Sequence, residues 1–267
     1  MNRVLMGHFV RLVVGGLASC FALAAPACPF NIVYSDQPSP PYYLGDGEAI
    51  PVNPGVAVEL LNLAAAKMGC TIKWHRLPNR RALRELENGD SDAMLLLSHT
   101  PERAVYAVYA VYPVIGATPD PTYSLATLSY SVYVKNDSAI KWENRQLSPA
   151  QTLIGVNSGY SVVEEIRKLG LAVEEASTTR NNVQKLFLGR IGAYVGQDLQ
   201  TDLALEEKHI TNVQKLPVPF SSKDYYLPFS KQFFFKSPAV GIQLWREIAE
   251  VRKTHGKALA KKYLDLN

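Results

Sequence analysis

Two kinds of hydrophobic pattern alternate along the first part of this chain. Continuous apolar runs of strand length occupy 30–35, 71–77 and 92–97, while 55–69 and 80–89 carry apolar residues at helical spacing. Strands that alternate with helices in this way are typical of a parallel sheet with helices on its faces. The pattern therefore predicts an α/β fold.

A second α/β run begins at the strand-like segment 129–137. We expect its further elements at these positions: strands 152–156, 171–175 and 192–196, and helices 160–169, 180–189 and 198–208. The long amphipathic stretch 239–264 is expected to return to the first half. Two similar halves predict two lobes joined by two chain crossings, with 25–117 plus 226–267 in lobe 1 and 118–225 in lobe 2.

The amino terminus has the composition of an export signal. Arg3 and Arg11 precede the uncharged run LVVGGLASCFALAAPA, which is too short to cross a bilayer and ends in small residues. We expect residues 1–24 to be a signal peptide that is removed on export to the periplasm. An alternative stays open, because LASC is also the pattern of a lipoprotein cleavage box that would leave a lipid on Cys20.

Composition and charge narrow the classes of partner. Hydrophobic residues make up 47% of the chain and charged residues 19%, which is a normal globular balance. Without residues 1–24 the chain holds 26 cationic and 24 acidic side chains, so it is nearly neutral. Bulk electrostatics therefore give no reason to expect a nucleic-acid partner.

Two cysteines remain after the expected signal cleavage. Cys28 precedes the strand at 30–35, and Cys70 precedes the strand at 71–77. If these strands pair in parallel, the two residues lie at equivalent strand ends, within reach of a disulfide that an oxidising compartment would preserve. Two free buried thiols are the alternative.

A set of segments spread over the mature chain forms a further pattern. They are SDQPSPPYY, GVAVELLNLAAAKMG, LENGDSDAMLLLSHTPER, GVNSGYS, LFLGRIGAYVGQD and the closing KKYLDLN. Together they resemble the bacterial extracellular solute-binding proteins of the polar amino-acid type, family 3 of the periplasmic substrate-binding proteins. The resemblance implies a ligand cleft between two lobes, a two-strand hinge, and an arginine, here Arg103, that binds the ligand carboxylate.

The end of the strand at 92–97 supports the same interpretation on physical grounds. In open parallel sheets ligands bind beyond the carboxyl ends of strands, and Arg103 follows such an end. A guanidinium donates two parallel hydrogen bonds to a carboxylate, and Ser98, Thr100 and backbone N–H groups add donors. We therefore expect an anion site here. The alternative is that Arg103 pairs with Glu102 or another surface acid.

The segment GVNSGYSVVEEI places Ser158, Gly159 and Tyr160 between a strand end and a helix. Backbone N–H groups at the amino terminus of a helix bind anionic groups, so we expect ligand contacts from this segment. Ordinary helix capping by Ser158 is the alternative.

Some positions depart from the family pattern and leave the ligand class open. Members usually carry an aromatic residue in the first loop, another after the second strand, and an acid that binds the ligand ammonium. An ungapped comparison places other residues at these sites: Ser39, Asn79 and Gln197. Asp198 could replace the acid, and Tyr42 or Tyr43 the missing ring. Arg80 and Arg81 add positive charge near the rim, which suits an anionic ligand unless both are solvated surface residues.

We expect a monomeric binding protein without a cofactor, which closes over a small carboxylate-bearing solute and presents the closed form to a membrane permease. Engagement of a sensor receptor or kinase is the main alternative. A cyclohexadienyl-dehydratase-like enzyme is the rival of a different class, with Asp36, Asp198 or Glu164 as candidate acids. His75 and His99 are not spaced as local metal ligands, so no metal site is expected.

Overall fold

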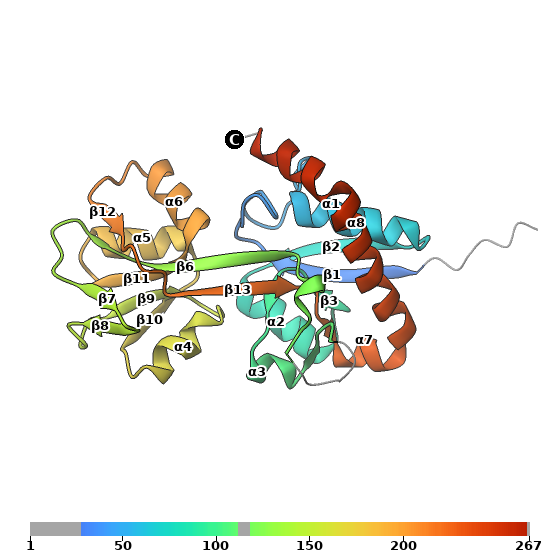
Figure 1. Cartoon of the computed structure of the whole chain (residues 1–267), viewed down its shortest axis with the longest axis horizontal. Coiled ribbons are helices and arrows are strands. Elements are labelled where there is room, and N and C mark those ends of the chain that lie inside the picture. The colour runs from blue at the N-terminus through green and yellow to red at the C-terminus, as the bar shows by residue number, and fades with distance from the viewer. Residues whose placement is uncertain (1–27, 112–117, 266–267) are drawn as a thin grey trace, which may run out of the picture.

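The computed structural model describes residues 28–111 and 118–265. Two lobes lie next to each other along the longest axis of the molecule, and two long strands run between them (Figure 1). This arrangement confirms the predicted two-lobed α/β fold. The expected signal peptide at 1–24 and the alternative lipid site at Cys20 lie outside the described residues.

Lobe 1 is built on a sheet with the strand order β2-β1-β3-β14-β5. Its strands are β1 (Pro29–Ser35), β2 (Thr71–Leu77), β3 (Ala93–Met94), β5 (Ala107–Val108) and β14 (Phe229–Ser230). β1 and β2 pair in parallel with Pro29 opposite Thr71, so the residues just before them are neighbours. Cys28 and Cys70 form the predicted disulfide there, with their Cα atoms 4.8 Å apart.

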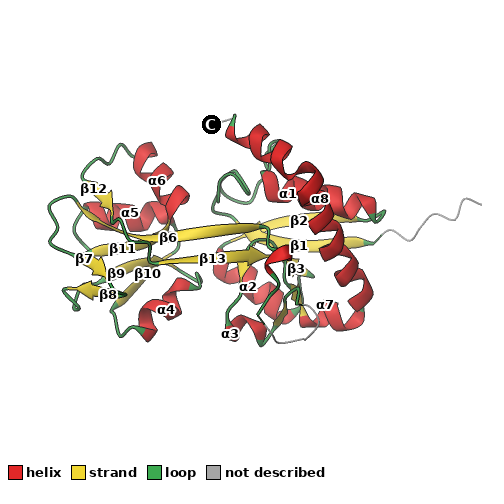
Figure 2. Ribbon diagram, in the orientation of Figure 1, coloured by secondary structure: helices red, strands yellow, loops and turns green. Residues whose placement is uncertain are grey.

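Helices cover this sheet on the outside. They are α1 (Val56–Lys67), α2 (Asn79–Asn88), α3 (Pro101–Ala104), α7 (Lys231–Lys236) and α8 (Pro238–Leu264), with the 3-10 helix η1 (Pro121–Tyr123). The long α8 packs along α1 (Figures 1 and 2), and Lys262 donates a hydrogen bond to Glu59 of α1 at 2.6 Å. Leu244, Ile248 and Val251 are buried because their helical spacing places them on one face of α8.

Lobe 2 is built on a second sheet with the order β10-β9-β11-β6-β13-β4, and β12 pairs with β6. Its strands are β4 (Leu97–Ser98), β6 (Ala126–Lys135), β9 (Ile154–Asn157), β10 (Val173–Ala176), β11 (Ala193–Gln197), β12 (Val213–Lys215) and β13 (Ser221–Tyr226). A separate hairpin consists of β7 (Lys141–Glu143) and β8 (Gln146–Ser148), and the helices are α4 (Val162–Lys168), α5 (Thr179–Phe187) and α6 (Asp198–Glu207). β9, β10 and β11 pair in parallel, as expected where strands alternate with helices.

β6 and β13 form the two-strand hinge. They pair antiparallel and are the long strands that connect the lobes in Figures 1 and 2. β4, which follows β3 in the chain, joins the edge of β13 with Ser98 opposite Tyr225. The expected lobe boundary at 117 lies outside the described residues, and the one at 225 stays a prediction.

The predicted continuous strand at 92–97 is wrong. β3 ends at Met94, Leu95 and Leu96 form a turn, and β4 begins at Leu97. Leu96 has a φ of 55°, a left-handed conformation that a residue with a side chain rarely adopts. The apolar pattern hides this turn, because its residues are as buried as those of the strands on either side.

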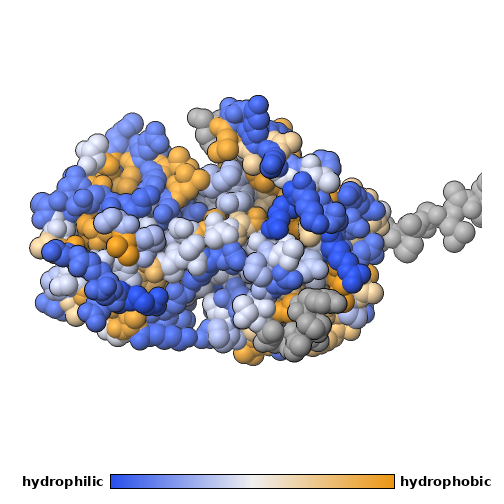
Figure 3. All heavy atoms as spheres, in the orientation of Figure 1, coloured by the Kyte–Doolittle hydropathy of each residue, from blue (hydrophilic) through white to orange (hydrophobic). Residues whose placement is uncertain are grey.

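The surface in Figure 3 is mostly hydrophilic, with separate hydrophobic patches, and its outline is notched between the lobes. Within 28–111 and 118–265, no helix is long and apolar enough to cross a bilayer.

Candidate functional site

Direct polar contacts join the two lobes. Asn79 Nδ2 at the start of α2 donates to the Ser158 carbonyl oxygen at 3.3 Å. The next residue, Arg80, pairs with Glu175 of β10 at 2.6 Å. The structure therefore represents a closed arrangement, in which groups from both lobes surround the space between them.

An inner cavity of about 40 Å³ lies between the lobes. Lobe 1, the loop after β1 and the edge strand β4 line it with Ser39, Tyr43, Asn79, Leu96, Leu97 and Arg103. The hinge strands and lobe 2 line it with Leu128, Tyr130, Tyr160, Ser161, Gln197 and Tyr225. Loops that follow strand ends meet here, which is where ligands bind in open α/β folds.

Arg103 is the guanidinium of this cavity, and it is only 7% exposed. Thr100 caps the short helix α3 by accepting a hydrogen bond from the Arg103 backbone N–H at 3.2 Å, which fixes the turn that carries the side chain. The guanidinium donates to the carbonyl and the hydroxyl of Ser98 at 2.8 Å each, and to the Gly159 carbonyl of lobe 2 at 2.9 Å. Arg103 thus links the two lobes.

The positive charge of Arg103 is not neutralised by a neighbouring acid. No carboxylate in the described part of the chain pairs with it, and Glu102, the partner considered from the sequence, contacts Lys168 at 3.2 Å instead. A guanidinium carries five N–H groups, so its hydrogen bonds to carbonyl and hydroxyl oxygens leave donors for a ligand. The charge and geometry suit an anion.

Hydroxyl groups connect Arg103 to a second cation, Lys223, whose side chain is 14% exposed. Ser98 Oγ donates to Ser161 Oγ at 3.0 Å, and Lys223 Nζ of β13 donates to the same oxygen at 2.8 Å. Lys223 also pairs with Glu165 of α4. Burial lowers the pKa of Lys223, although Glu165 acts in the opposite direction. With two cations and one acid, this group of residues is net positive.

The tyrosines of the cavity are neutral hydrogen-bonding groups. Burial raises the pKa of Tyr43, Tyr130, Tyr160 and Tyr225, so each stays protonated at physiological pH. The hydroxyls of Tyr130 and Tyr225 are hydrogen-bonded to each other. Neutral phenols donate hydrogen bonds and offer apolar ring faces, so they suit the oxygen atoms and the carbon skeleton of an organic ligand.

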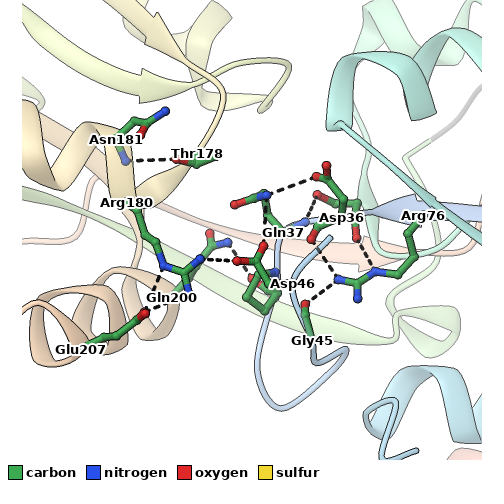
Figure 4. Close-up of polar contacts among 12 residues, drawn as sticks. Asp36, Gln37, Gly45, Asp46, Arg76, Thr178, Arg180, Asn181, Gln200 and Glu207 are labelled. Atoms are coloured by element: carbon green, nitrogen blue, oxygen red, sulfur yellow. Dashed lines mark hydrogen bonds and ion pairs between the residues drawn. The ribbon is translucent and has the colours of Figure 1, made fainter. Parts of the chain in front are cut away.

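Arg76 of β2 holds the loop between β1 and α1 (Figure 4). This side chain is 2% exposed and donates to backbone carbonyl oxygens between Ser35 and Ala49 at 2.6 to 3.3 Å. The same loop carries Ser39 and Tyr43 to the inner cavity. Arg76 therefore positions part of the cavity wall without lining the cavity.

The loop also reaches lobe 2 at the rim of the cleft. Asp46 pairs with Arg180 of α5, which also contacts Glu207 at 3.0 Å (Figure 4). Beside this pair, Gln200 Nε2 donates to the Pro38 carbonyl oxygen at 2.6 Å. The Arg180 side chain is 38% exposed, and exposed ion pairs are individually weak.

A wider chamber of about 300 Å³ adjoins the inner cavity. The two spaces share Arg103, Tyr160 and Ser161, so a ligand could extend from one into the other. Arg80 and Arg167 also line the chamber, and both pair with Glu175, at 2.6 and 2.8 Å. The charges of Arg80 and Arg167 are thus largely neutralised.

The structure brings most of the sequence-predicted site residues to these two spaces. Those that line the inner cavity are Ser39, Asn79, Arg103, Tyr160 and Gln197, and those that line the chamber include Arg80, Thr100 and Gly159. Ser98 lies behind the guanidinium as a hydrogen-bond acceptor. That these residues bind a ligand stays a prediction.

The other predicted residues lie elsewhere. Tyr42 and Ser158 line neither space, although Tyr43, the alternative ring, lines the cavity. Asp198 begins α6, and its carboxylate lies 3.8 Å from Lys215 Nζ of β12. This placement gives no support to Asp198 as an ammonium ligand in the cavity.

The acids considered for an enzyme are not grouped at the inner cavity. Asp36 and Asp198 line neither space, and Glu164 lines the chamber, where it pairs with Arg167 at 2.5 Å. Over the described ranges, no group of three or more histidine, cysteine or acidic side chains is arranged to hold a metal ion.

Sequence reasoning missed Tyr130, Tyr225, Ser161 and Lys223. Tyr130 lies on hinge strand β6, and Lys223 and Tyr225 lie on hinge strand β13. The sequence does not mark these positions as facing a cleft. The alternation of side chains along β6 places Leu128 and Tyr130 on one face, which was an available signal. A tyrosine in a strand is equally typical of a core, so alternation alone does not identify the cavity.

Comparison with known proteins gives matches only at the level of structure. No protein-family model and no curated protein matches this sequence. A histidine kinase sensor domain with similarity to periplasmic binding proteins matches with a TM-score of 0.71 and 16% identity, over 89% of this chain and 96% of that chain. This chain has the fold of the periplasmic binding proteins.

Further periplasmic-binding-protein structures agree. The arginine-, lysine-, histidine-binding protein ArtJ from Geobacillus stearothermophilus matches with a TM-score of 0.67 and 15% identity, over 88% of this chain and 95% of that chain. The substrate binding protein of an amino acid ABC transporter matches with a TM-score of 0.62 and 18% identity, over 89% and 98% of the chains. The resemblance seen in the sequence is confirmed for the fold.

Proposed function

We propose that this protein binds a small carboxylate-bearing solute between its lobes and delivers it to a membrane transporter. The observation that carries the proposal is Arg103, a buried guanidinium at the cavity whose described neighbours include no ion-pairing acid. Buried charges in proteins are normally paired, so a ligand anion is its natural partner. Lys223 adds positive charge behind it.

Binding is coupled to closure because the site belongs to both lobes. Arg103 and Asn79 come from lobe 1, whereas Tyr160 and Gln197 come from lobe 2. A ligand that touches all of them receives its full set of contacts only when the cleft is closed. The closed form is then the signal that a partner protein recognises.

The solute is captured outside the cytoplasm. The Cys28–Cys70 disulfide supports this location, because such bonds persist in oxidising compartments. Among the similar structures are an ABC-transporter binding protein and a histidine kinase sensor domain, so sensing is a second candidate use of the closed form. The dehydratase alternative gains no support from the inner cavity, because its described lining contains no carboxylate.

A thermal-shift screen tests the proposal. The purified protein is screened against monocarboxylates, dicarboxylates, aromatic acids and amino acids, together with Arg103→Ala and the control Arg81→Ala on the exposed face of α2. A ligand at one hundred times its dissociation constant adds about 2.7 kcal/mol of stability, which shifts the melting temperature by a few degrees.

We expect a carboxylate-dependent shift that Arg81→Ala keeps and Arg103→Ala loses. The melting temperature of unliganded Arg103→Ala shows whether that variant is folded. The proposal fails if no carboxylate stabilises the parent protein, or if folded Arg103→Ala responds as the parent does.

A further inference from the structure

The inner cavity has an unbalanced set of charges. Among the described residues that line the cavity, Arg103 is the one that carries a charge, and none of them is a carboxylate. The remaining polar groups are hydroxyls and amides, and the pKa values of the tyrosines are raised by burial, so they carry no negative charge. The cavity can therefore neutralise an anionic group but offers no counter-charge to a cationic one.

Gln197 is an uncharged polar residue of the cavity lining. It ends β11 directly before α6, and it is 4% exposed. Its side-chain oxygen Oε1 is buried and accepts no hydrogen bond from the described residues. A buried acceptor without a donor costs about 1 to 3 kcal/mol, so a ligand donor that reaches this oxygen would be favoured.

Asp198, the acid next to Gln197 in the sequence, does not supply the missing negative charge in the cavity. Asp198 follows Gln197 but does not line the cavity, and its carboxylate lies 3.8 Å from Lys215 Nζ. On the other side, Lys223 and Arg103 already place two cations around Ser161. Glu165 balances one of these charges through its pair with Lys223, so an ammonium group in the cavity would add to a net positive charge with no acid in the described lining to balance it.

We propose that the ligand is a small hydroxy acid rather than an amino acid, an inference that rests on the proposed carboxylate-binding function. The carboxylate pairs with Arg103, and the ligand hydroxyl donates to Gln197 Oε1. The member of the Tyr130–Tyr225 pair that does not donate within the pair donates to a remaining ligand oxygen. The limited volume of the cavity favours a compact head group, while a longer skeleton can extend into the adjoining chamber.

Matched ligand pairs test this inference. Each pair shares a skeleton and differs at one substituent: L-lactate and L-alanine, L-phenyllactate and L-phenylalanine, L-malate and L-aspartate. Calorimetric titration measures the dissociation constant of each. Because a buried ammonium without a counter-charge is strongly disfavoured, we expect the hydroxy acid of at least one pair to bind about 100-fold tighter or more than its amino acid.

The comparison with the unsubstituted acid tests the contact to Gln197. Propionate lacks the lactate hydroxyl, and 3-phenylpropionate lacks that of phenyllactate. We expect the unsubstituted member of the responding pair to bind about tenfold weaker or more, because Oε1 then keeps no donor. Equal binding of the two would overturn the hydroxyl contact.

Two variants of Gln197 reverse or remove the preference. Gln197→Glu places a carboxylate in the cavity, so we expect weaker hydroxy-acid binding and stronger amino-acid binding, by about tenfold each. Gln197→Ala removes the acceptor without adding charge and should abolish the advantage of lactate over propionate. Gln214→Glu at an exposed position of β12 makes the same charge change away from the cavity. It should alter neither hydroxy-acid binding nor amino-acid binding.

The outcomes separate this inference from the function on which it rests. If amino acids bind as tightly as their hydroxy acids, the protein still binds carboxylates and only the ligand class is wrong. If no acid of any pair binds, the carboxylate-binding function itself is overturned.

Discussion

At the rim of the cleft, Arg180 contacts the carboxylates of Asp46 and Glu207, whereas inside the cleft Arg103 contacts only carbonyl and hydroxyl oxygens. Arg80 at the chamber wall behaves like Arg180, because it pairs with Glu175. The rim arginines thus join the lobes with their charge already neutralised. The interior arginine also joins the lobes, but it keeps its charge for a ligand.

Arg76 shows that an interior arginine can also be purely structural. It is as buried as Arg103 and donates only to backbone carbonyls, but it does not line the cavity. Burial without an acid is therefore not enough to identify a ligand site. What distinguishes Arg103 is that its guanidinium also borders an enclosed space.

The largest effect is expected for Arg76→Met. The substitution keeps an unbranched apolar stem but leaves buried carbonyl oxygens of the loop without donors, so the free energy of unfolding should fall by about 2 to 4 kcal/mol. Urea unfolding measures this loss, and the exposed control Arg81→Met should stay within about 0.5 kcal/mol of the parent. An equally small change for Arg76→Met would show that other contacts hold the loop.

A smaller effect is expected for Glu165→Gln. Lys223 then loses its carboxylate partner, so the free energy of unfolding at pH 7 should fall. We expect a loss of about 1 to 3 kcal/mol, less than for a fully buried pair, because this pair is partly exposed. The pKa of Lys223 is already lowered by burial in the parent, and the variant lowers it further.

The sign of the pH dependence follows from that lowered pKa. The cost of burying the lysine charge is complete below the folded pKa and vanishes above the unfolded value near 10.4. The stability difference between Glu165→Gln and the parent should therefore shrink as the pH rises from 7 to 10. A difference that is constant over this range would mean that Lys223 does not cause it.

The smallest effect on stability is expected for Arg180→Ala at the rim. Exposed pairs contribute less than about 1 kcal/mol, but this pair joins the lobes, so its loss should favour the open form of the unliganded protein. Small-angle scattering should show a larger radius of gyration, and Asp46→Asn should give the same change. High salt should reproduce it in the parent by screening the pair. An unchanged radius in both variants would contradict a role in closure.

Much of the fold was predictable because strands and helices alternate regularly, and the Cys28–Cys70 disulfide followed from parallel pairing of the first two strands. The position of Arg103 at a strand end was predictable for the same reason. The turn at Leu96 was not, because burial there depends on neighbours distant in sequence. Tyr130 and Tyr225 were missed since their orientation toward the cavity depends on how the hinge strands cross between the lobes.

The most direct test measures the pairing of Arg103 with a ligand carboxylate. Dissociation constants are determined for the responding acid and for its primary amide, with the parent protein and with Arg103→Ala, which completes a double-mutant cycle across the interface. The parent should prefer the acid over the amide by about 30-fold or more, and the variant by less than about threefold. An undiminished preference for the acid in folded Arg103→Ala would contradict the claim that the charge of Arg103 is reserved for the ligand.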